Sequence, residues 1–117
     1  QTTKRHSFMT KQLLDVLAHV GLAELPSRVG GLDVMMHSWG AVLSTGEQQR
    51  IAFARLLLHQ PMFAVLDEAS SALDHANEQL LYTKLQETTP TYVSVGHRES
   101  LVKFHTHVLQ GGYVRCT

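Results

Sequence analysis

The sequence contains only one cysteine, Cys116, so a disulfide bond within the chain is excluded. Such sparse cysteine usage is typical of proteins in a reducing compartment. No apolar run approaches the roughly 20 residues that a membrane-spanning helix needs, and the residues after Gln1 show no signal-peptide pattern. We therefore expect any action of this chain at a membrane to require partner segments that cross it.

The sequence also lacks an excess of charge of either sign. Lysine plus arginine and aspartate plus glutamate number 10 each, so bulk charge gives no reason to expect a nucleic-acid partner. The hydrophobic content of 44% and the charged content of 17% are ordinary for a globular protein. A length of 117 residues suffices for one domain but is modest for an α/β domain.

One polar stretch, Leu43 to Arg50, has the features of a helix start. Ser44 is a favourable N-cap residue, and Glu47 follows at the spacing of a capping box. Gly46 is a poor helix former, but it allows a backbone or an anion to approach closely. Because a helix start leaves N–H groups unpaired and carries partial positive charge, this stretch suits a phosphate. A plain N-cap role for Ser44 is the alternative, and the two roles are compatible.

A second stretch is apolar and ends in two carboxylates. The run Met62–Leu66 predicts a strand covered on both faces, and Asp67 and Glu68 follow where the chain turns. Adjacent acids at the end of a buried strand hold a metal or activate a water. An Asp-Glu pair in a loop is usually just solvated, but the strand before it and the polar Ser70-Ser71 turn after it favour the functional interpretation.

Periodicity and turn residues predict the other elements. Thr10 and Gly21 are expected to begin and end a helix, and Asp74 to cap another whose inner face carries Leu80, Leu81 and Leu85. A strand, a helix and a strand at this spacing indicate a parallel βαβ unit with a right-handed crossover. The predicted elements are helices over about 10–20, 45–59 and 75–86, a strand over 92–95, a helical turn over 100–104 and a hairpin around 111–112, with irregular structure over 28–39.

His97 follows the second strand of this unit and Gly96, so we expect it at the same sheet edge as Asp67 and Glu68. Histidines in a chain with 8 of them are most often structural or on the surface. Its place behind the βαβ unit favours a functional role for His97. We expect the others to be structural, although His105-x-His107 has a spacing that metals accept and lacks a further ligand.

Together these residues resemble the ATP-binding cassette (ABC) ATPases. Leu43–Gln49 resembles the LSGGQ-like signature, and Phe63–Glu68 resembles the Walker B strand with its catalytic glutamate. Ser71–Asp74 is similar to the D-loop, and His97 stands where the family has its switch histidine. The fold class that the resemblance implies is α/β, the C-terminal half of a P-loop NTPase domain.

The resemblance implies ATP and Mg²⁺ as cofactors and gives each residue a role. Asp67 helps to hold Mg²⁺ through its water shell, Glu68 is the general base that polarises the attacking water, and His97 contacts the γ-phosphate. Two domains form a head-to-tail homodimer, and the signature of one domain binds the γ-phosphate of the ATP held by the other. The residues implied in nucleotide binding at that seam are Ser44, Thr45, Gly46, Glu47, Gln48 and, from the D-loop, Asp74.

The resemblance departs from the family pattern in small and large ways. Thr45 replaces a frequent glycine, Glu47 the common glutamine and Ser70 a frequent threonine, and none of these changes removes a group that the chemistry needs. No G-x-x-x-x-G-K-[ST] phosphate loop occurs, nor do a Q-loop and an adenine-stacking aromatic. We therefore expect 1–117 to be a partial ABC ATPase domain without its Walker A half, with a helical subdomain over about 10–43 and the remaining motifs over 44–117. Such a fragment is not expected to bind ATP tightly or hydrolyse it alone.

The residues around the motifs are similar to those of the bacterial and plastid relatives of the subfamily D (peroxisomal fatty-acyl) transporters. This likeness lies in residues 39–44, 49–55, 94–98 and 101–105. It implies a transmembrane domain on the same full-length chain, at the cytosolic face of a bacterial inner or an organelle membrane, and an amphipathic organic substrate. Two alternatives stay open: a soluble ABC-type ATPase without transport, and a non-catalytic truncated remnant.

Overall fold

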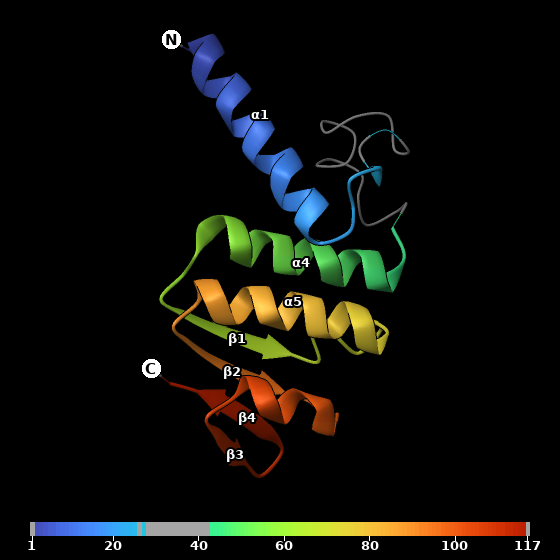
Figure 1. Cartoon of the computed structure of the whole chain (residues 1–117), viewed down its shortest axis with the longest axis vertical. Helices are drawn as coiled ribbons and strands as arrows, with labels where there is room; N and C mark the ends of the chain where they lie inside the picture. Colours follow the sequence, from blue (N-terminus) through green and yellow to red (C-terminus); the bar gives the residue numbers. More distant parts are fainter. Residues whose placement is uncertain (1, 26, 28–42, 117) are drawn as a thin grey trace.

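The computed structural model describes residues 2–25, 27 and 43–116 (Figure 1). Helices α4 and α5 lie side by side on one face of a sheet, and α1 contacts α4 from the other side. Among the described residues, no helix is both long and apolar enough to cross a membrane. In chain order the elements are α1 (Thr2–His19), α4 (Thr45–His59), β1 (Phe63–Asp67), α5 (His75–Thr88), β2 (Thr91–Val95), the 3-10 helix η1 (Glu99–Phe104), β3 (His107–Leu109) and β4 (Gly112–Arg115).

The strands of the described residues form a sheet in the order β1-β2-β4-β3. β1 and β2 are parallel, in a register that pairs Phe63 with Thr91 and Asp67 with Val95. β4 pairs antiparallel with both β2 and β3. The predicted parallel pair and the terminal hairpin are thus confirmed. Because β1 and β2 end at paired residues, the turns that follow them meet at one sheet edge.

The described residues cover only one face of β1, whereas the sequence predicts that both faces are covered. Its side chains alternate, with Ala64 and Leu66 buried under the helices and Phe63 and Val65 exposed at 56% and 65%. Among the strands of the described residues β1 lies at the edge of the sheet, and no described element packs on its second face. An unbroken apolar run does not reveal whether one face of a strand or both are covered.

Helix α4 begins and ends where the sequence predicts. Ser44 accepts a hydrogen bond from the Glu47 N–H at 3.2 Å, and the Glu47 carboxylate accepts one from the Ser44 N–H at 3.0 Å, so the capping box is confirmed. At the other end Gln60 has a φ of 48°, and Pro61 follows. The capping box fixes the orientation in which the start of α4 meets the rest of the site.

Helix α5 is capped as predicted, because Asp74 accepts a hydrogen bond from the Asn77 N–H at 2.8 Å. The expected inner face is partly wrong, since Leu80 is 44% exposed. The spacing i, i+3, i+4, i+7 instead puts two polar residues on the buried stripe. The buried side chains of this stripe are Glu78, Leu81, Tyr82 and Leu85.

Helix α1 begins at Thr2, so the prediction that Thr10 begins it is wrong. The residues before Thr10 contain no glycine or proline that would stop a helix. Its end is confirmed: Gly21 has a φ of 81°, and the hydrogen bonds from Leu22 N to Leu17 O and from Gly21 N to Ala18 O form a Schellman motif. The predicted irregular structure over 28–39 lies outside the described residues.

A chain of hydrogen bonds crosses the core beside η1. The Leu101 carbonyl only accepts, so the His105 Nδ1 that lies 2.6 Å from it carries the proton. His105 Nε2 therefore accepts from the Ser94 hydroxyl at 2.8 Å, and the Tyr82 hydroxyl donates to Ser94 at 3.0 Å. Both ring nitrogens of His105 are occupied, so the ring is not available to a metal, and the predicted structural role agrees with this placement.

Burial lowers the pKa of His105 below its ordinary value of 6.5, and the nearby Arg115 acts in the same direction. At a pH below 6.5 the histidine of the unfolded chain binds a proton more readily than folded His105 does. We therefore expect the free energy of unfolding to decrease as the pH falls. The decrease is at most about 1.4 kcal/mol per pH unit for one proton. Urea unfolding between pH 5 and 8 measures it. His105→Gln should remove this contribution to the slope of the free energy of unfolding against pH. His75→Gln, at an exposed position, should leave the slope unchanged. Equal slopes in the two variants would contradict the assignment to His105.

Candidate active site at the carboxyl ends of β1 and β2

Two predicted catalytic side chains meet at the sheet edge where β1 and β2 end. The Glu68 N–H donates to the Val95 carbonyl at 2.9 Å, which extends the pairing of the strands by one residue. His97 follows two residues later, and its Nε2 lies 3.4 Å from Oε1 of Glu68. The side chains of His97 and Glu68 are 87% and 43% exposed, so both are accessible to a ligand. The sequence therefore predicted their proximity correctly.

The backbone of Glu68 has an unusual conformation. Its φ of 53° lies in the left-handed region, which residues other than glycine rarely adopt. Such a conformation costs on the order of 1–3 kcal/mol and persists where surrounding contacts hold it. The turn formed by residues 68–74, here called the 68–74 turn, begins at this residue and ends at the cap of α5. What holds the turn also fixes the direction of the Glu68 side chain.

Gln49, in the second turn of α4, makes the first set of contacts with the 68–74 turn. Its Nε2 donates to the Glu68 carbonyl at 3.1 Å and to the Ser71 hydroxyl at 3.0 Å. Its Oε1 accepts from the Ala72 N–H at 2.9 Å. The sequence does not predict this role of Gln49, because its partners follow 19 to 23 residues later and no spacing rule connects them.

Arg98 makes the second set of contacts, from the residue after His97. Its guanidinium donates to the carbonyls of Ser71 and Leu73, both at 2.8 Å. It also lies 3.0 Å from the carboxylate of Glu78, whose side chain is fully buried. That carboxylate accepts two further hydrogen bonds, from the hydroxyls of Ser70 and Ser100 at 2.6 and 2.9 Å. The turn with Glu68 and the segment with His97 are thus joined through one charge pair whose carboxylate is buried.

The predicted nucleotide-binding residues at the start of α4 lie beside this turn. A Cβ added to Gly46 would be 3.4 Å from the Ala72 carbonyl, so the first turn of α4 contacts the 68–74 turn. A hollow of about 720 Å³ between α4 and β1 is lined in part by Thr45, Gln48, Asp67 and Glu68. The predicted seam residue Asp74 closes the same turn and is exposed.

Asp67 is exposed at the end of β1, and the donor set around it suits a hard cation that arrives with phosphate. Mg²⁺ is usually bound through one or two carboxylates together with phosphate oxygens and waters. In the part of the chain that the structure describes, no cluster of three or more histidine, cysteine or acidic side chains is placed to hold an ion. The residues present thus fit Mg²⁺ that comes with a nucleotide and do not form an all-protein cage.

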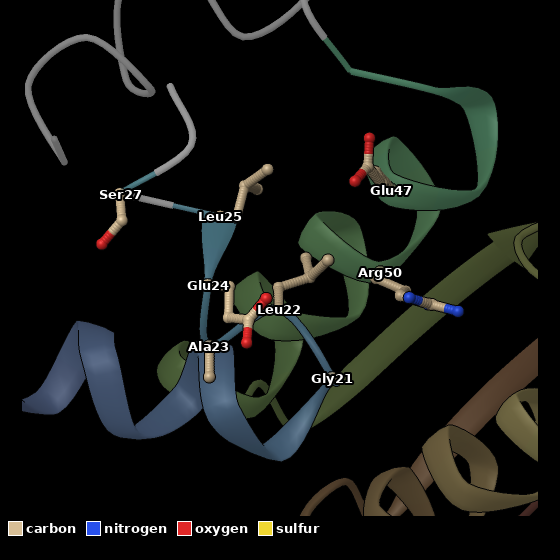
Figure 2. A pocket seen from close by; sticks show the side chains of 8 residues that line it. All are labelled: Gly21, Leu22, Ala23, Glu24, Leu25, Ser27, Glu47 and Arg50. Atoms are coloured by element: carbon tan, nitrogen blue, oxygen red, sulfur yellow. The ribbon is translucent and has the colours of Figure 1, made fainter. Parts of the chain in front are cut away.

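A second hollow lies where the segment after α1 meets α4 (Figure 2). Figure 2 shows Gly21–Leu25 and Ser27 beside α4, which contributes Glu47 and Arg50. The hollow measures about 810 Å³. It has none of the side chains at the edge where β1 and β2 end.

Comparison with known proteins gives consistent matches. The model of the ABC transporter family matches residues 1–71. An ABC transporter D family member 2 from the chloroplast of Arabidopsis thaliana is 54% identical over 101 residues, which are 86% of this chain and 14% of that protein. An uncharacterized ABC transporter ATP-binding protein of Synechocystis is 51% identical over 98 residues, 84% of this chain and 15% of its own length.

A third similar protein is the lysosomal cobalamin transporter ABCD4 of Mus musculus, which is 48% identical over 101 residues, 86% of this chain and 17% of that protein. In each case the chain corresponds to less than a fifth of its relative. These matches extend over the 68–74 turn and the segments that hold it.

Proposed function

We propose, from the fact that the chain belongs to the ABC transporter family, that it forms part of the ATPase that powers a membrane transporter. The observation that carries this proposal is the meeting of Glu68 and His97 at the ends of paired parallel strands, directly after Asp67. Phosphoryl transfer depends on positioned charges more than on covalent chemistry by the protein. At this sheet edge the carboxylate of Glu68 and the imidazole of His97 are both accessible to solvent.

Each residue at this edge then has a defined task. Glu68 accepts the proton of the attacking water as general base, because its half-exposed carboxylate stands in reach of solvent and of His97. His97 donates a hydrogen bond to the terminal phosphate and orients it. Asp67 would hold Mg²⁺, which supplies charge neutralisation to the phosphates when it is bound.

The start of α4 is proposed to act on the nucleotide of a second subunit. The capping box uses the N–H groups of Ser44 and Glu47. The N–H groups of Thr45 and Gly46 have no partner within the helix, so this turn suits a terminal phosphate. Ser44 is exposed beside them, and Glu47 and Gln48 complete the segment. Asp74, at the end of the 68–74 turn, lies at the same proposed seam of a head-to-tail dimer.

The proposal extends to a membrane partner. We place the ATPase at the cytosolic face of a membrane, joined to a transmembrane domain of the same protein, with an amphipathic organic substrate. The hollow that Gly21–Leu25 and Ser27 form with α4 supports a contact with that domain, because it is lined by a mixture of apolar and charged side chains, among them Leu22, Glu24 and Arg50. Of the relatives, the mouse protein is named as a cobalamin transporter.

Replacing Ser44 by arginine tests the two-subunit arrangement. In the complete transporter, Ser44→Arg should lower ATP hydrolysis by about 100-fold or more, because a long cation fills the place of the phosphate contact. ATP binding should stay close to wild type, since the phosphate loop of the same subunit is untouched. Steady-state ATPase assays and nucleotide-binding titrations measure the two quantities, with Gln110→Arg in the exposed hairpin turn as the matched control.

A mixing experiment makes this test sharper. Subunits with Ser44→Arg and subunits with Glu68→Gln are each expected to be inactive as homodimers. In a mixed head-to-tail dimer both defects fall in one site and the other site is intact, so an equal mixture should recover about a quarter of the wild-type rate. If mixing restores nothing, each subunit hydrolyses ATP on its own residues and the sandwich is refuted.

A further inference from the structure

We infer that Gln49 is a positioning residue for ATP hydrolysis, which ties the general base Glu68 to the helix whose start binds phosphate. This inference rests on the proposed function and adds a residue and a connection to it. Gln49 touches neither of the proposed reacting side chains. It acts through the main chain of Glu68 and of the residues that follow.

The carboxamide of Gln49 makes three hydrogen bonds with the 68–74 turn. Both Nε2 hydrogens have an acceptor, the Glu68 carbonyl and the Ser71 hydroxyl, and Oε1 accepts from the Ala72 N–H. Only the carboxamides of glutamine and asparagine offer two donors and an acceptor from one planar group, and asparagine is shorter by one methylene. This match of donors and acceptors indicates a specific contact, not a side chain that merely fills space.

The bond to the Glu68 carbonyl holds a residue that is strained. Glu68 has a φ of 53°, and relaxation of this angle would swing its carboxylate away from the position opposite His97. The Glu68 N–H is fixed by Val95 in β2, so the sheet holds one side of the residue. Gln49 holds the carbonyl on the other side, and the two bonds together define the direction of the general base.

The same contact links two parts of the proposed mechanism. Gln49 is one residue after the proposed phosphate-binding segment 44–48, on the same rigid helix. A shift of the start of α4 toward the phosphate of the second subunit would move the Gln49 carboxamide, and with it the carbonyl of Glu68. The general base of one site is thereby coupled to the occupancy of the other.

The contact is also local, which makes it testable. Gln49 is only partly buried, and the three groups that its carboxamide hydrogen-bonds all lie in the 68–74 turn. Arg98 holds the carbonyls of Ser71 and Leu73 in the same turn independently. Loss of the Gln49 bonds should therefore free the Glu68 end of the turn while the Arg98 end stays in place.

The experiment compares Gln49→Glu and Gln49→Met with wild type in the complete transporter. Gln49→Glu keeps the acceptor for Ala72 but replaces the donor to the Glu68 carbonyl by a second acceptor. We expect kcat for ATP hydrolysis to fall by about 10- to 100-fold, as for a misplaced catalytic group, with KM for ATP within twofold of wild type. Gln12→Glu, exposed on α1, is the charge-matched control and should behave as wild type.

A pH profile separates positioning from a merely structural role. A protonated carboxyl regains one O–H donor, so the ratio of the Gln49→Glu rate to the wild-type rate should rise as the pH is lowered from 8 to 5.5. Gln49→Met has no such proton, and its ratio should stay flat. A flat ratio in both variants would overturn the inference. A fall in unfolding midpoint that accounts for the lost rate would overturn it too.

Glu68→Gln, assayed in parallel, distinguishes failure of the inference about Gln49 from failure of the proposed function. If Glu68→Gln is inactive and both Gln49 variants keep the wild-type kcat, the role of Gln49 is refuted and the proposed function stands. If Glu68→Gln itself hydrolyses ATP at the wild-type rate, the general base is misassigned, and the inference about Gln49 falls with it.

Discussion

Replacing Glu68 by glutamine is expected to lower the rate of ATP hydrolysis by about 100- to 10,000-fold, the usual contribution of a positioned general base. The amide keeps the shape of the side chain and loses the capacity to take a proton from water. Glu68 is half-exposed at the sheet edge, 3.4 Å from His97, so the change removes a reactive group without opening a cavity. ATP should still bind, and the variant should accumulate in the ATP-bound state.

A steady-state ATPase assay together with quantification of trapped nucleotide measures both effects in the complete transporter. Glu87→Gln is the matched control, because it makes the same change at an exposed position of α5. A Glu68→Gln protein with normal turnover would show that another group activates the water. A protein that loses ATP binding as well would show that Glu68 serves the ground state and not the reaction.

Several features of this edge could be predicted because their causes are local. The caps at Ser44 and Asp74 depend on residues three positions apart, and the glycine that ends α1 acts on its own backbone. The meeting of Glu68 with His97 follows from one rule, that parallel strands joined by a helix end at the same sheet edge. Such rules need only the order of residues along the chain.

The contacts that hold the 68–74 turn could not be predicted in this way. Gln49 is 19 residues from Glu68, and Arg98 is 20 residues from Glu78. Their pairing depends on the exact rotation of α4 and α5 over the sheet. Glu78 also contradicts the usual expectation that a helical glutamate faces water, since its carboxylate is fully buried. Only the position of its partners explains why it is buried.

The difference in burial between the two faces of β1 could not be predicted from the sequence either. Val65 has the same chemistry as its buried neighbours, yet it is 65% exposed because it points away from α4 and α5. Its cross-strand partner Val93 is on the same face and is only partly buried. A strand with apolar residues on both faces predicts two covering layers, and the described residues supply one. The apolar run indicates that both faces of β1 favour burial, but it does not indicate which face another element covers.

Replacing Arg98 by methionine is expected to destabilise the protein by about 3 kcal/mol. The change leaves the Glu78 carboxylate buried without its cation, and breaking a buried ion pair from one side costs about 3–5 kcal/mol. The lower end applies because Arg98 is itself 39% exposed, although Glu78 is fully buried. The variant also loses the donors to the carbonyls of Ser71 and Leu73. Urea unfolding at neutral pH measures the free energy, with Lys11→Met, exposed on α1, as the control.

A second substitution separates the charge from the lost hydrogen bonds. Adding Glu78→Gln to Arg98→Met removes the unpaired carboxylate, and the amide can still bond to the hydroxyls of Ser70 and Ser100. The double variant should therefore be more stable than Arg98→Met alone, since the desolvation cost of a buried charge is gone. Equal stability of the two variants would mean that the cost lies in the freed carbonyls. Both variants lack the Arg98 guanidinium, which fixes the segment with His97 to the 68–74 turn. We therefore expect the turnover of both variants to stay below wild type, even where the free energy of unfolding is restored.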